Sequence, residues 1–439
     1  MTVTNSQKAA DAINSKTELE TLAAAISENT AILSDFLRAE NLPQPSFKRD
    51  APTTVLSPSA PDHIKKAQRA LIEASLKAYE LATGPSEYLP NLALGYNYTA
   101  ALRWLRHFNI FYLVPLEGSI SYSDLAKTAK VSARQLRTMA RMAMTSNLFA
   151  EPKKGFIAHS ATSALFVTNP SYHDWAGHLC EVSIPAASKL VEATEKWPGT
   201  TDRTETSYNL AFDTRLPFFE HMATQPHRTK QFASYMKHVT NSSGMAIEHL
   251  VNGFDWASLG KATVVDVGGS SGNACISLAK QFPDLNFVVQ DLAENTSDGE
   301  ATIGDYGPEI ASRIKFQSHD FFQEQPVKGA DVYLLRMILH DWPDKEAIQI
   351  SKSLARAMSS SSRILIMDSV MPIPGSIPSS LERNIRAKDI AMWMAFNSME
   401  RDLGDWEELL ENIDDRLQIA NVVQPVSSFM SVLEVVCKS

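Results

Sequence analysis

The chain contains few cysteines. Only three occur among its 439 residues, and they are Cys180, Cys275 and Cys437. An odd number of widely spaced cysteines supports neither a disulfide framework nor a Cys-x-x-Cys metal site, so we expect a reducing compartment and no bound metal. Cys437 is followed by too few residues for a prenylation box.

Long apolar runs are missing too. No stretch approaches the ~20 apolar residues that span a bilayer. The first residues, MTVTNSQKAADAINS, are polar and lack the apolar core of a signal peptide. We therefore expect a cytoplasmic protein that makes no membrane contact.

Positive charge is in deficit. Lys and Arg number 41 against 50 Asp and Glu, which gives a net charge of −9 and no global attraction to nucleic acid. The composition, 44% hydrophobic and 21% charged, is that of a folded globular protein. At about 150 residues per domain, the length predicts two or three domains.

The N-terminal part predicts two helices joined by a linker. Over residues 17–40, apolar side chains recur at three- and four-residue spacing, namely at Leu19, Leu22, Ile26, Leu33 and Phe36. This stripe either packs on its own domain or forms a dimer contact. Prolines between residues 43 and 61 predict an extended linker, and a second helix is expected over 62–82, before Gly84-Pro85.

Residues 95–160 have the pattern of a winged helix-turn-helix. A helix and tight turn over 121–132 precede a second helix at 134–143, and two short extended pieces flank Lys154-Gly155. Arg134, Arg137 and Arg141 share one face of the second helix. They would contact DNA phosphates in a regulator, or form a solvated face; the acidic chain favours the second interpretation. Residues 165–255 read as mostly helical.

The C-terminal part alternates strands and helices. A helix is expected over 273–282, and strands are expected at 263–267, 286–290, 314–318, 331–336, 363–368 and 430–436. Alternation of this kind predicts a mostly parallel, doubly wound sheet.

A glycine turn, residues 268–272, follows the first of these strands. It does not match the dinucleotide fingerprint G-x-G-x-x-G, because Ser270 and Asn273 occupy the second and third glycine positions. Asp266, inside the strand end, suits a ligand that carries an ammonium group.

Acidic residues also follow the next two strands. Asp291 ends the second strand, where an acidic residue accepts both ribose hydroxyls in doubly wound nucleotide folds. Asp320 and Phe321 follow the third strand, where a polar group and an aromatic face suit an adenine. An ammonium, a ribose and an adenine together describe S-adenosylmethionine (SAM).

Four segments, VVDVGGSSG, FVVQDL, HDFF and LLRMILHDWPDKEAIQI, resemble the SAM-dependent O-methyltransferases of the caffeate O-methyltransferase type, especially their fungal secondary-metabolism branch. The resemblance covers roughly residues 95–437. It implies a class I SAM-methyltransferase fold: an α/β, Rossmann-like doubly wound sheet with an N-terminal α-helical winged-helix dimerisation domain. The implied domains are a helical arm and linker (1–60), the winged-helix dimerisation domain (61–165), and a helical connector with the SAM-binding catalytic domain (166–439).

The resemblance also implies roles for residues at matching positions. Asp266, Gly268 and Gly272 would line the methionine end of SAM, Asp291 would hold the ribose, and Asp320 and Phe321 would flank the adenine, with Gly269 and Leu292 beside them and Arg336 closing the site.

The general base of the family is the histidine of its HDW motif, here His340. It would remove a proton from a phenol or enol whose oxygen then attacks the methyl group of SAM. Asp368 and Glu400 match the carboxylates that orient this base, and Asp368 stands where plant members usually carry Glu. Arg336 belongs to the same catalytic set.

The substrate wall departs from the family pattern. Met337 replaces the usual aromatic residue, and His159 would face the pocket from the lid or lie on the surface of the wing. The remaining candidates for this wall are Phe218, Phe219, Trp393, Met394 and Asn397.

Three functions remain open at this point. His340 favours O-methylation of a phenolic or enolic small molecule. Met337 hints at a related pericyclase or cyclase, which keeps SAM as a bound electrostatic cofactor and catalyses dehydration or Diels-Alder-type ring closure of a polyketide–amino acid product. A winged-helix transcription regulator is the third, and the acidic composition argues against it. We expect a homodimer formed through the N-terminal helices and the winged-helix module.

Overall fold

A computed structural model describes residues 16–57 and 59–438. The chain forms two compact units. The first comprises the described residues up to Cys180 together with Pro378–Ser380, and the second comprises Glu181–Ile377 and the residues from Leu381 onward. The polar segment 1–15, including the start of the expected arm, lies outside the described residues, and the domain boundaries at 60 and 165 stay predictions.

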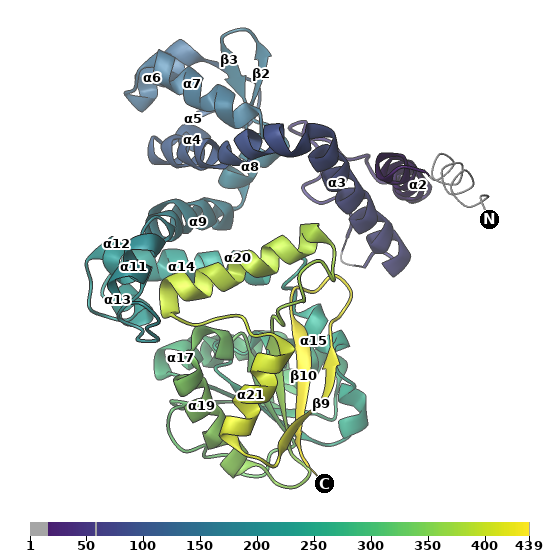
Figure 1. Ribbon diagram of the computed structural model, residues 1–439, viewed down its shortest axis with the longest axis vertical. Helices are drawn as coiled ribbons and strands as arrows, with labels where there is room; N and C mark the ends of the chain where they lie inside the picture. The colour runs from purple at the N-terminus through teal and green to yellow at the C-terminus, as the bar shows by residue number, and fades with distance from the viewer. Residues whose placement is uncertain (1–15, 58, 439) are drawn as a thin grey trace, which may run out of the picture. The chain divides into compact units, whose positions relative to one another are not determined.

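The first unit begins with two helices that pack on each other (Figure 1). They are α2 (Glu18–Ala39) and α3 (Asp62–Ala93). Leu33 and Leu37 of α2 are buried against Ile64 of α3, so part of the predicted stripe packs on its own unit. α3 is longer than predicted: Gly84, at φ 71°, interrupts the helix, and the chain then continues in helical conformation.

The predicted helix-turn-helix and wing follow. The helices are α4 (Gly95–His107), α5 (Ile110–Leu113), α6 (Tyr122–Ala129) and α7 (Ala133–Met144). An antiparallel sheet of order β1-β3-β2 joins them, with β1 (Ile120–Ser121), β2 (Ala150–Lys153) and β3 (Phe156–Ala158). Helices α8 (Ala161–Thr168) and α9 (Pro170–His178) complete the unit.

Arg141 has a structural partner in this unit. Its guanidinium donates to both carboxylate oxygens of Glu151 at 2.8 Å, and Glu151 also accepts from the N–H of Gly155 at the tip of the wing. One of the three candidate DNA-contacting arginines therefore holds the wing against α7.

A run of helices opens the second unit, as predicted for residues 165–255. After the π-helical turn η1 (Leu179–Ser183), the helices are α10 (Ile184–Ala187), α11 (Leu190–Lys196), α12 (Ser207–Phe212), α13 (Phe218–Ala223), α14 (Pro226–Thr240) and α15 (Glu248–Asn252).

A seven-stranded sheet of order β6-β5-β4-β7-β8-β10-β9 forms the centre of the second unit. Its strands are β4 (Thr263–Val267), β5 (Asn286–Asp291), β6 (Ile314–Ser318), β7 (Val332–Arg336), β8 (Arg363–Asp368), β9 (Leu417–Val423) and β10 (Ser431–Cys437). Strands β4 to β8 are parallel, and β10 and β9 run antiparallel to them. The six predicted strands are confirmed, and β9 was missed.

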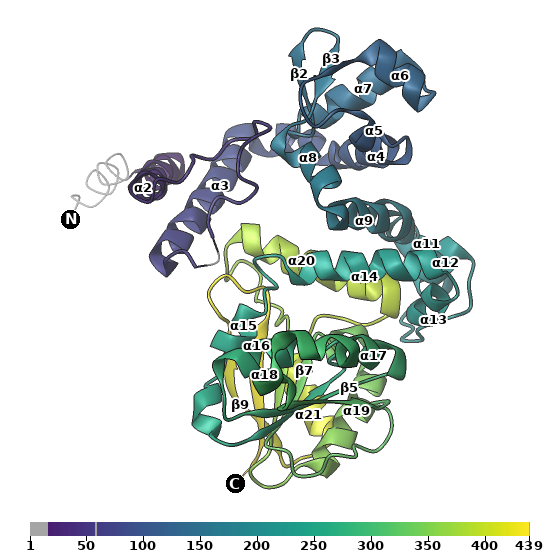
Figure 2. The same ribbon diagram turned by 180° about the vertical axis from the view of Figure 1, so that it is seen from behind.

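Helices cover both faces of this sheet. On one face lie α16 (Asn273–Gln281), α17 (Ala293–Thr302) and α18 (Pro308–Ala311), as Figure 2 shows. The short η2 (Trp256–Leu259) and η3 (Ile303–Tyr306) pack on the same face through Trp256 and Ile303. On the other lie α19 (Asp344–Ala357) and α21 (Leu403–Ile413), labelled in Figure 1. Along β4, Val264 packs on the first face and Val265 on the second. The predicted doubly wound sheet is confirmed.

Two further elements carry site residues. The short η4 (Leu339–Asp341) follows β7, and the long α20 (Ser379–Phe396) follows β8. Among the described residues, none of the helices has the length and apolarity that a membrane crossing needs.

Candidate active site

The carboxyl ends of the parallel strands bring the predicted residues to one edge of the sheet. Because β4 to β8 are parallel neighbours, the segments that follow them lie side by side at this edge. The chain places there the glycine turn after β4, Asp291 at the end of β5, Asp320 after β6, Arg336 at the end of β7, and Asp368 at the end of β8.

The glycine turn is packed too tightly for other side chains. The N–H groups of Gly268 and Gly269 donate to the carbonyl of Gln290, at 2.8 and 3.0 Å. A Cβ on Gly268 would lie 2.5 Å from Cδ1 of Ile338, and one on Gly269 would lie 2.6 Å from Oδ2 of Asp266. Gly268 and Gly272 also adopt positive φ, 76° and 78°, which glycine tolerates without strain.

Asp266 is buried directly beneath this turn. Its side chain accepts a hydrogen bond from Sγ of Cys275 at 3.3 Å. Burial raises the pKa of Asp266 to about 6, although this bond and the positive charge of Arg336 act in the opposite direction. A buried carboxylate in this position gains stability from a cationic ligand.

Asp291 closes the turn from the neighbouring strand. Oδ2 accepts from the N–H of Ser270 at 2.8 Å, and Oδ1 accepts from the N–H of Leu292 at 2.8 Å and from Asn295 at 2.7 Å. Leu292 itself is exposed. The carboxylate is thus held in a fixed orientation at the end of β5.

After β6, Asp320 and Phe321 form a polar and aromatic pair. Oδ1 of Asp320 accepts from the N–H of Phe322 at 3.0 Å. The ring of Phe321 meets Trp342 edge to face, with 5.6 Å between ring centroids. Trp342 is the tryptophan of the HDW segment, so Phe321 packs against the segment that carries His340.

His340 lies in η4 and is buried. Its Nδ1 is 2.9 Å from Oε1 of Glu400 and 3.9 Å from Oδ1 of Asp368. Its Nε2 is 3.5 Å from Oδ1 of Asp341. The structure therefore brings together His340, Asp368 and Glu400, the three residues of the predicted base and its carboxylates.

Nearby charges affect the pKa values of His340 and Glu400 more than burial does. Burial disfavours the imidazolium, but the negative charges of Glu400, Asp341 and Asp368 outweigh it and raise the pKa of His340 to about 9. Burial acts to raise the pKa of Glu400, yet the positive charges of His340 and Lys388 lower it to about 2. Burial raises the pKa of Asp368 to about 6.

Sequence reasoning missed two residues that hold this loop. Arg401 is 1% exposed, and its guanidinium donates to the carbonyls of Leu339 and Trp342, each at 2.9 Å, on either side of His340. The hydroxyl of Ser398 donates to the carbonyl of His340 at 2.6 Å. Both flank Glu400 in the segment NSMERD, and that proximity was the available signal.

Arg336 and Met337 shape the chain between β7 and η4. Arg336 is enclosed; Nη2 donates to the carbonyl of Met245 at 2.8 Å, and the positive charge is attracted to Asp266 and Asp368. Burial lowers the pKa of Arg336. Met337 adopts φ 58°, an unusual conformation for a residue with a side chain, and turns the chain toward His340.

The candidates for the substrate wall separate into buried and exposed residues. Phe218, Phe219 and Met394 pack in one cluster with Phe396, where Phe219 stacks on Phe396 with 5.2 Å between ring centroids. Trp393 is 46% exposed. The side-chain amide of Asn397 donates to the carbonyls of Asp202 and Glu205, which gives it a structural contact.

His159 does not lie on the surface of the wing, one of the two positions that the sequence predicts for it. It is 4% exposed within the core of the first unit. Nε2 lies 3.1 Å from the carbonyl of Phe111 and 3.2 Å from that of Val114, and Nδ1 lies 2.9 Å from the hydroxyl of Ser163. Nε2 finds these partners because the end of α5 supplies carbonyls that its own helix does not satisfy, and Nδ1 is held by α8 through Ser163.

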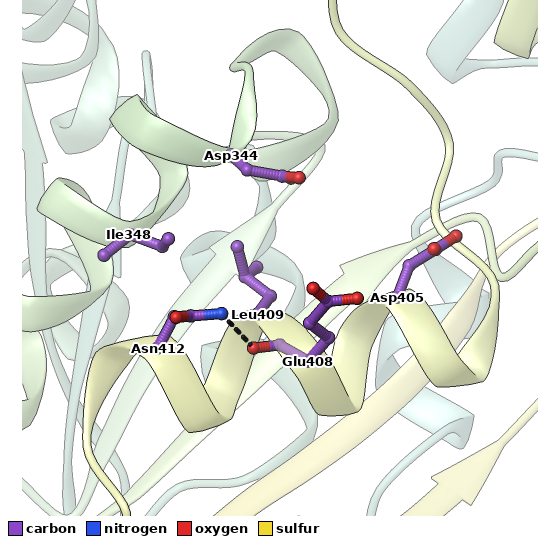
Figure 3. Close-up of a pocket in the computed structure, with 6 residues that line it drawn as sticks. All are labelled: Asp344, Ile348, Asp405, Glu408, Leu409 and Asn412. Atoms are coloured by element: carbon purple, nitrogen blue, oxygen red, sulfur yellow. Dashed lines mark hydrogen bonds between the residues drawn. The ribbon is translucent and has the colours of Figure 1, made fainter.

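Figure 3 shows a small hollow elsewhere in the second unit, between α19 and α21. Its volume is about 50 Å³, and its walls are Asp344, Ile348, Asp405, Glu408, Leu409 and Asn412. This is well below the several hundred Å³ of an ordinary ligand site, and none of the predicted site residues lines it.

Comparison with known proteins identifies the family. The O-methyltransferase domain family matches residues 198–413, and the O-methyltransferase dimerisation domain family matches residues 91–169. O-methyltransferase bik3 of Gibberella fujikuroi is 46% identical over 95% of this chain and 92% of its own length. O-methyltransferase VdtC of Byssochlamys spectabilis is 48% identical over 96% of this chain and 98% of its own. The chain belongs to the O-methyltransferase family.

Solved structures agree on the fold. LepI in complex with SAM covers 95% of this chain with all of its own, at a TM-score of 0.70 and 23% identity. A protein described as a pericyclic reaction enzyme aligns over 85% of this chain and 94% of its own, at a TM-score of 0.69 and 25% identity. The predicted class I SAM-methyltransferase fold is confirmed. Because relatives at 46–48% identity are O-methyltransferases, the protein is a SAM-dependent O-methyltransferase, and the pericyclase alternative gains no comparable support.

The residues at the sheet edge fit SAM. The buried carboxyl of Asp266 suits a cationic ligand, and the fixed carboxylate of Asp291 suits hydroxyl donors. Among the described residues, the enclosed Nε of Arg336 and both oxygens of Asp368 have no hydrogen-bond partner, which leaves polar groups available to bound molecules.

Proposed function

We propose that His340 is the general base of the methyl transfer and that Glu400 and Asp368 orient it. The observation that carries this proposal is the buried contact between Nδ1 of His340 and Oε1 of Glu400, 2.9 Å long. A carboxylate at Nδ1 accepts a hydrogen bond from the N–H of that nitrogen, which leaves the lone pair on Nε2. The arrangement has the logic of other histidine bases that a buried carboxylate orients.

The protein's contribution to the reaction is then proton removal and charge stabilisation. Nε2 of His340 takes the proton from a hydroxyl of the acceptor as the oxygen attacks. SAM, when bound, supplies an electrophilic methyl group and departs as S-adenosylhomocysteine. The imidazolium that forms is stabilised by Glu400 and Asp368, whose negative charges already favour it in the free protein.

We also propose the binding roles predicted from the sequence. Asp266 and the glycine turn would hold the methionine end of SAM, Asp291 and Leu292 the ribose, and Asp320 and Phe321 the adenine, while Arg336 would close the site between Asp266 and Asp368. Support comes from their shared position at the carboxyl ends of β4 to β8.

The acceptor class that fits this chemistry is a phenolic or enolic small molecule of fungal secondary metabolism. Such hydroxyls are acidic enough for a histidine base. The fungal relatives bik3 and VdtC, both named O-methyltransferases, support methyl transfer to an oxygen atom.

The dimerisation domain supports a homodimer. We propose that α2, α3 and the winged-helix module form its contact, because α3 and the residues after it expose large apolar side chains, among them Leu89, Leu92 and Tyr96. The small, odd number of widely spaced cysteines supports a reducing, cytoplasmic location.

The test is methyl transfer from isotopically labelled SAM to a panel of polyhydroxylated naphthalenes and anthracenes. The proposal expects one labelled methyl and one S-adenosylhomocysteine per turnover. His340→Gln should lower kcat by at least about 100-fold, the contribution of a positioned base. The control is His227→Gln, which changes an exposed histidine of α14. A His340→Gln enzyme within a few-fold of wild type contradicts the assignment of the base.

A further inference from the structure

Lys388 is a charged residue of the active site to which neither the sequence nor the family resemblance assigned a role. It lies on α20 with its side chain 19% exposed. Its Nζ is 3.2 Å from Oε1 of Glu400, the same oxygen that Nδ1 of His340 contacts at 2.9 Å. Its Nζ also donates to the hydroxyl of Ser369 at 3.1 Å, so the ammonium group is fixed between β8 and the Glu400 segment.

Without Lys388, the negative charges around His340 would outnumber the positive ones. Three carboxylates surround a single imidazole: Asp368 and Glu400, which are buried, and Asp341, which is partly buried. Lys388 attracts all three of them, and Arg203 attracts Asp341. Arg336 attracts Asp368 as well. The carboxylate of Asp389 accepts a hydrogen bond from the backbone N–H of Glu400.

A general base must be neutral, whereas the carboxylates around His340 favour its protonated form. Three negative charges hold the proton on His340, whereas a general base must be unprotonated when the acceptor arrives. A cation that contacts Oε1 of Glu400 partly neutralises the negative charge of this carboxylate. The same cation repels the imidazolium, so both effects favour the neutral imidazole of His340.

We propose that Lys388 is a positioning residue that shares the charge of Glu400 with His340 and thereby sets the pH range in which His340 accepts a proton. The proposal rests on the function proposed for His340, but its main measurement does not depend on catalysis. Removal of the lysine charge leaves Glu400 to His340 alone and makes the imidazole harder to deprotonate.

The experiment is an NMR titration of the full-length protein labelled with 13C at Cε1 of histidine. The chain has 11 histidines, and His340→Gln identifies the resonance of His340 by its loss. Lys388→Gln keeps a hydrogen-bond donor but removes the charge, and Lys388→Arg keeps the charge. Lys352→Gln, an equal change of charge at a partly exposed position of α19, is the matched control.

Lys388→Gln should raise the midpoint of the His340 titration by about one pH unit. Lys388→Arg and Lys352→Gln should leave it within about 0.3 unit of wild type, less than half of that shift. In methylation assays with any phenol from the panel that is turned over, Lys388→Gln should lose up to about tenfold in kcat/KM below the midpoint and recover at higher pH.

Two results would overturn the proposal: an unchanged midpoint in Lys388→Gln, or equal shifts in Lys388→Gln and Lys388→Arg, which would indicate a packing role. Lys388→Met, which retains most of the aliphatic stem, replaces the glutamine variant if circular dichroism shows that the latter is unfolded. Activity retained by His340→Gln would refute the base while the titration still tests Lys388.

Discussion

Nδ1 of His340 lies 2.9 Å from Oε1 of Glu400, and both side chains are buried. Sixty positions separate the two residues in the chain. The contact joins the turn after β7 to the segment after α20, so the proposed base depends on two parts of the fold that meet only in the tertiary structure. Its strength comes from low solvent access, because charges inside a protein are screened less than charges on its surface.

Glu400→Gln should therefore slow methylation without weakening SAM binding. The amide removes the charge that stabilises the imidazolium, so we expect kcat to fall by about 10- to 100-fold, part of what a positioned base contributes. The acidic limb of the pH–rate profile should move to lower pH, since one negative charge beside His340 is gone. Steady-state kinetics and SAM calorimetry measure both effects. Glu407→Gln, an exposed change on α21, is the control, and an unchanged kcat would exclude a catalytic role for Glu400.

The raised pKa of His340 predicts how stability depends on pH. The folded protein holds this proton up to a pH of about 9, whereas the unfolded chain releases it near 6.5. The resulting stabilisation is fully present below pH 6.5 and is lost as the pH rises to about 9. Urea unfolding at both pH values should show a loss, on the order of a few kcal/mol at most, that His340→Gln lacks. Equal losses in the two proteins would contradict the raised pKa.

Gly268→Ala should damage the glycine turn. The new methyl group would meet Ile338 at 2.5 Å, and alanine would be strained at φ 76°. We expect the free energy of unfolding to fall by about 1–3 kcal/mol and SAM affinity to weaken by about tenfold, because the turn moves away from its contacts with β5. Gly304→Ala is the matched control, since nothing lies within 4 Å of its Cβ position. If both variants bind SAM and melt alike, the turn does not need glycine at position 268.

The strands were predictable where the sheet is buried on both faces. β4, β6 and β8 have the bounds expected from the sequence, and β4 and β8 read as apolar runs because helices cover both sides of them. β9 was missed because it is an edge strand with four exposed residues, and its sequence LQIANVV does not alternate. Sequence patterns detect burial, and β9 has little of it.

The site was predictable only in part, for a related reason. Carboxylates at strand ends are visible in the sequence, because topology alone brings them to one edge. Lys388 is on a helix, where a lysine ordinarily indicates a solvated face, and only the tertiary structure shows it at Glu400. His159 is the converse case: it is buried, and its partners are two backbone carbonyls and the hydroxyl of Ser163, contacts that no sequence pattern reveals.

Arg401 links the stability of the second unit to the position of the base. Its guanidinium binds the carbonyls of Leu339 and Trp342 and the carboxylate of Asp344, the last at 2.7 Å. Lysine carries the same charge but cannot reach three acceptors with a rigid fork of donors. Arg401→Lys should therefore leave buried carbonyls unsatisfied, which costs about 2–4 kcal/mol in the free energy of unfolding.

The same substitution should separate catalysis from cofactor binding. The loop that carries His340 loses its anchor, whereas Asp266 and Asp291 keep theirs, so Arg401→Lys should lower kcat by about tenfold or more and change the SAM dissociation constant by less than about threefold. Arg416→Lys, at an exposed arginine paired with Asp414, is the control for the chemical change. Equal weakening of kcat and SAM binding would mean that Arg401 supports the whole sheet edge, because a displaced His340 alone leaves the glycine turn intact.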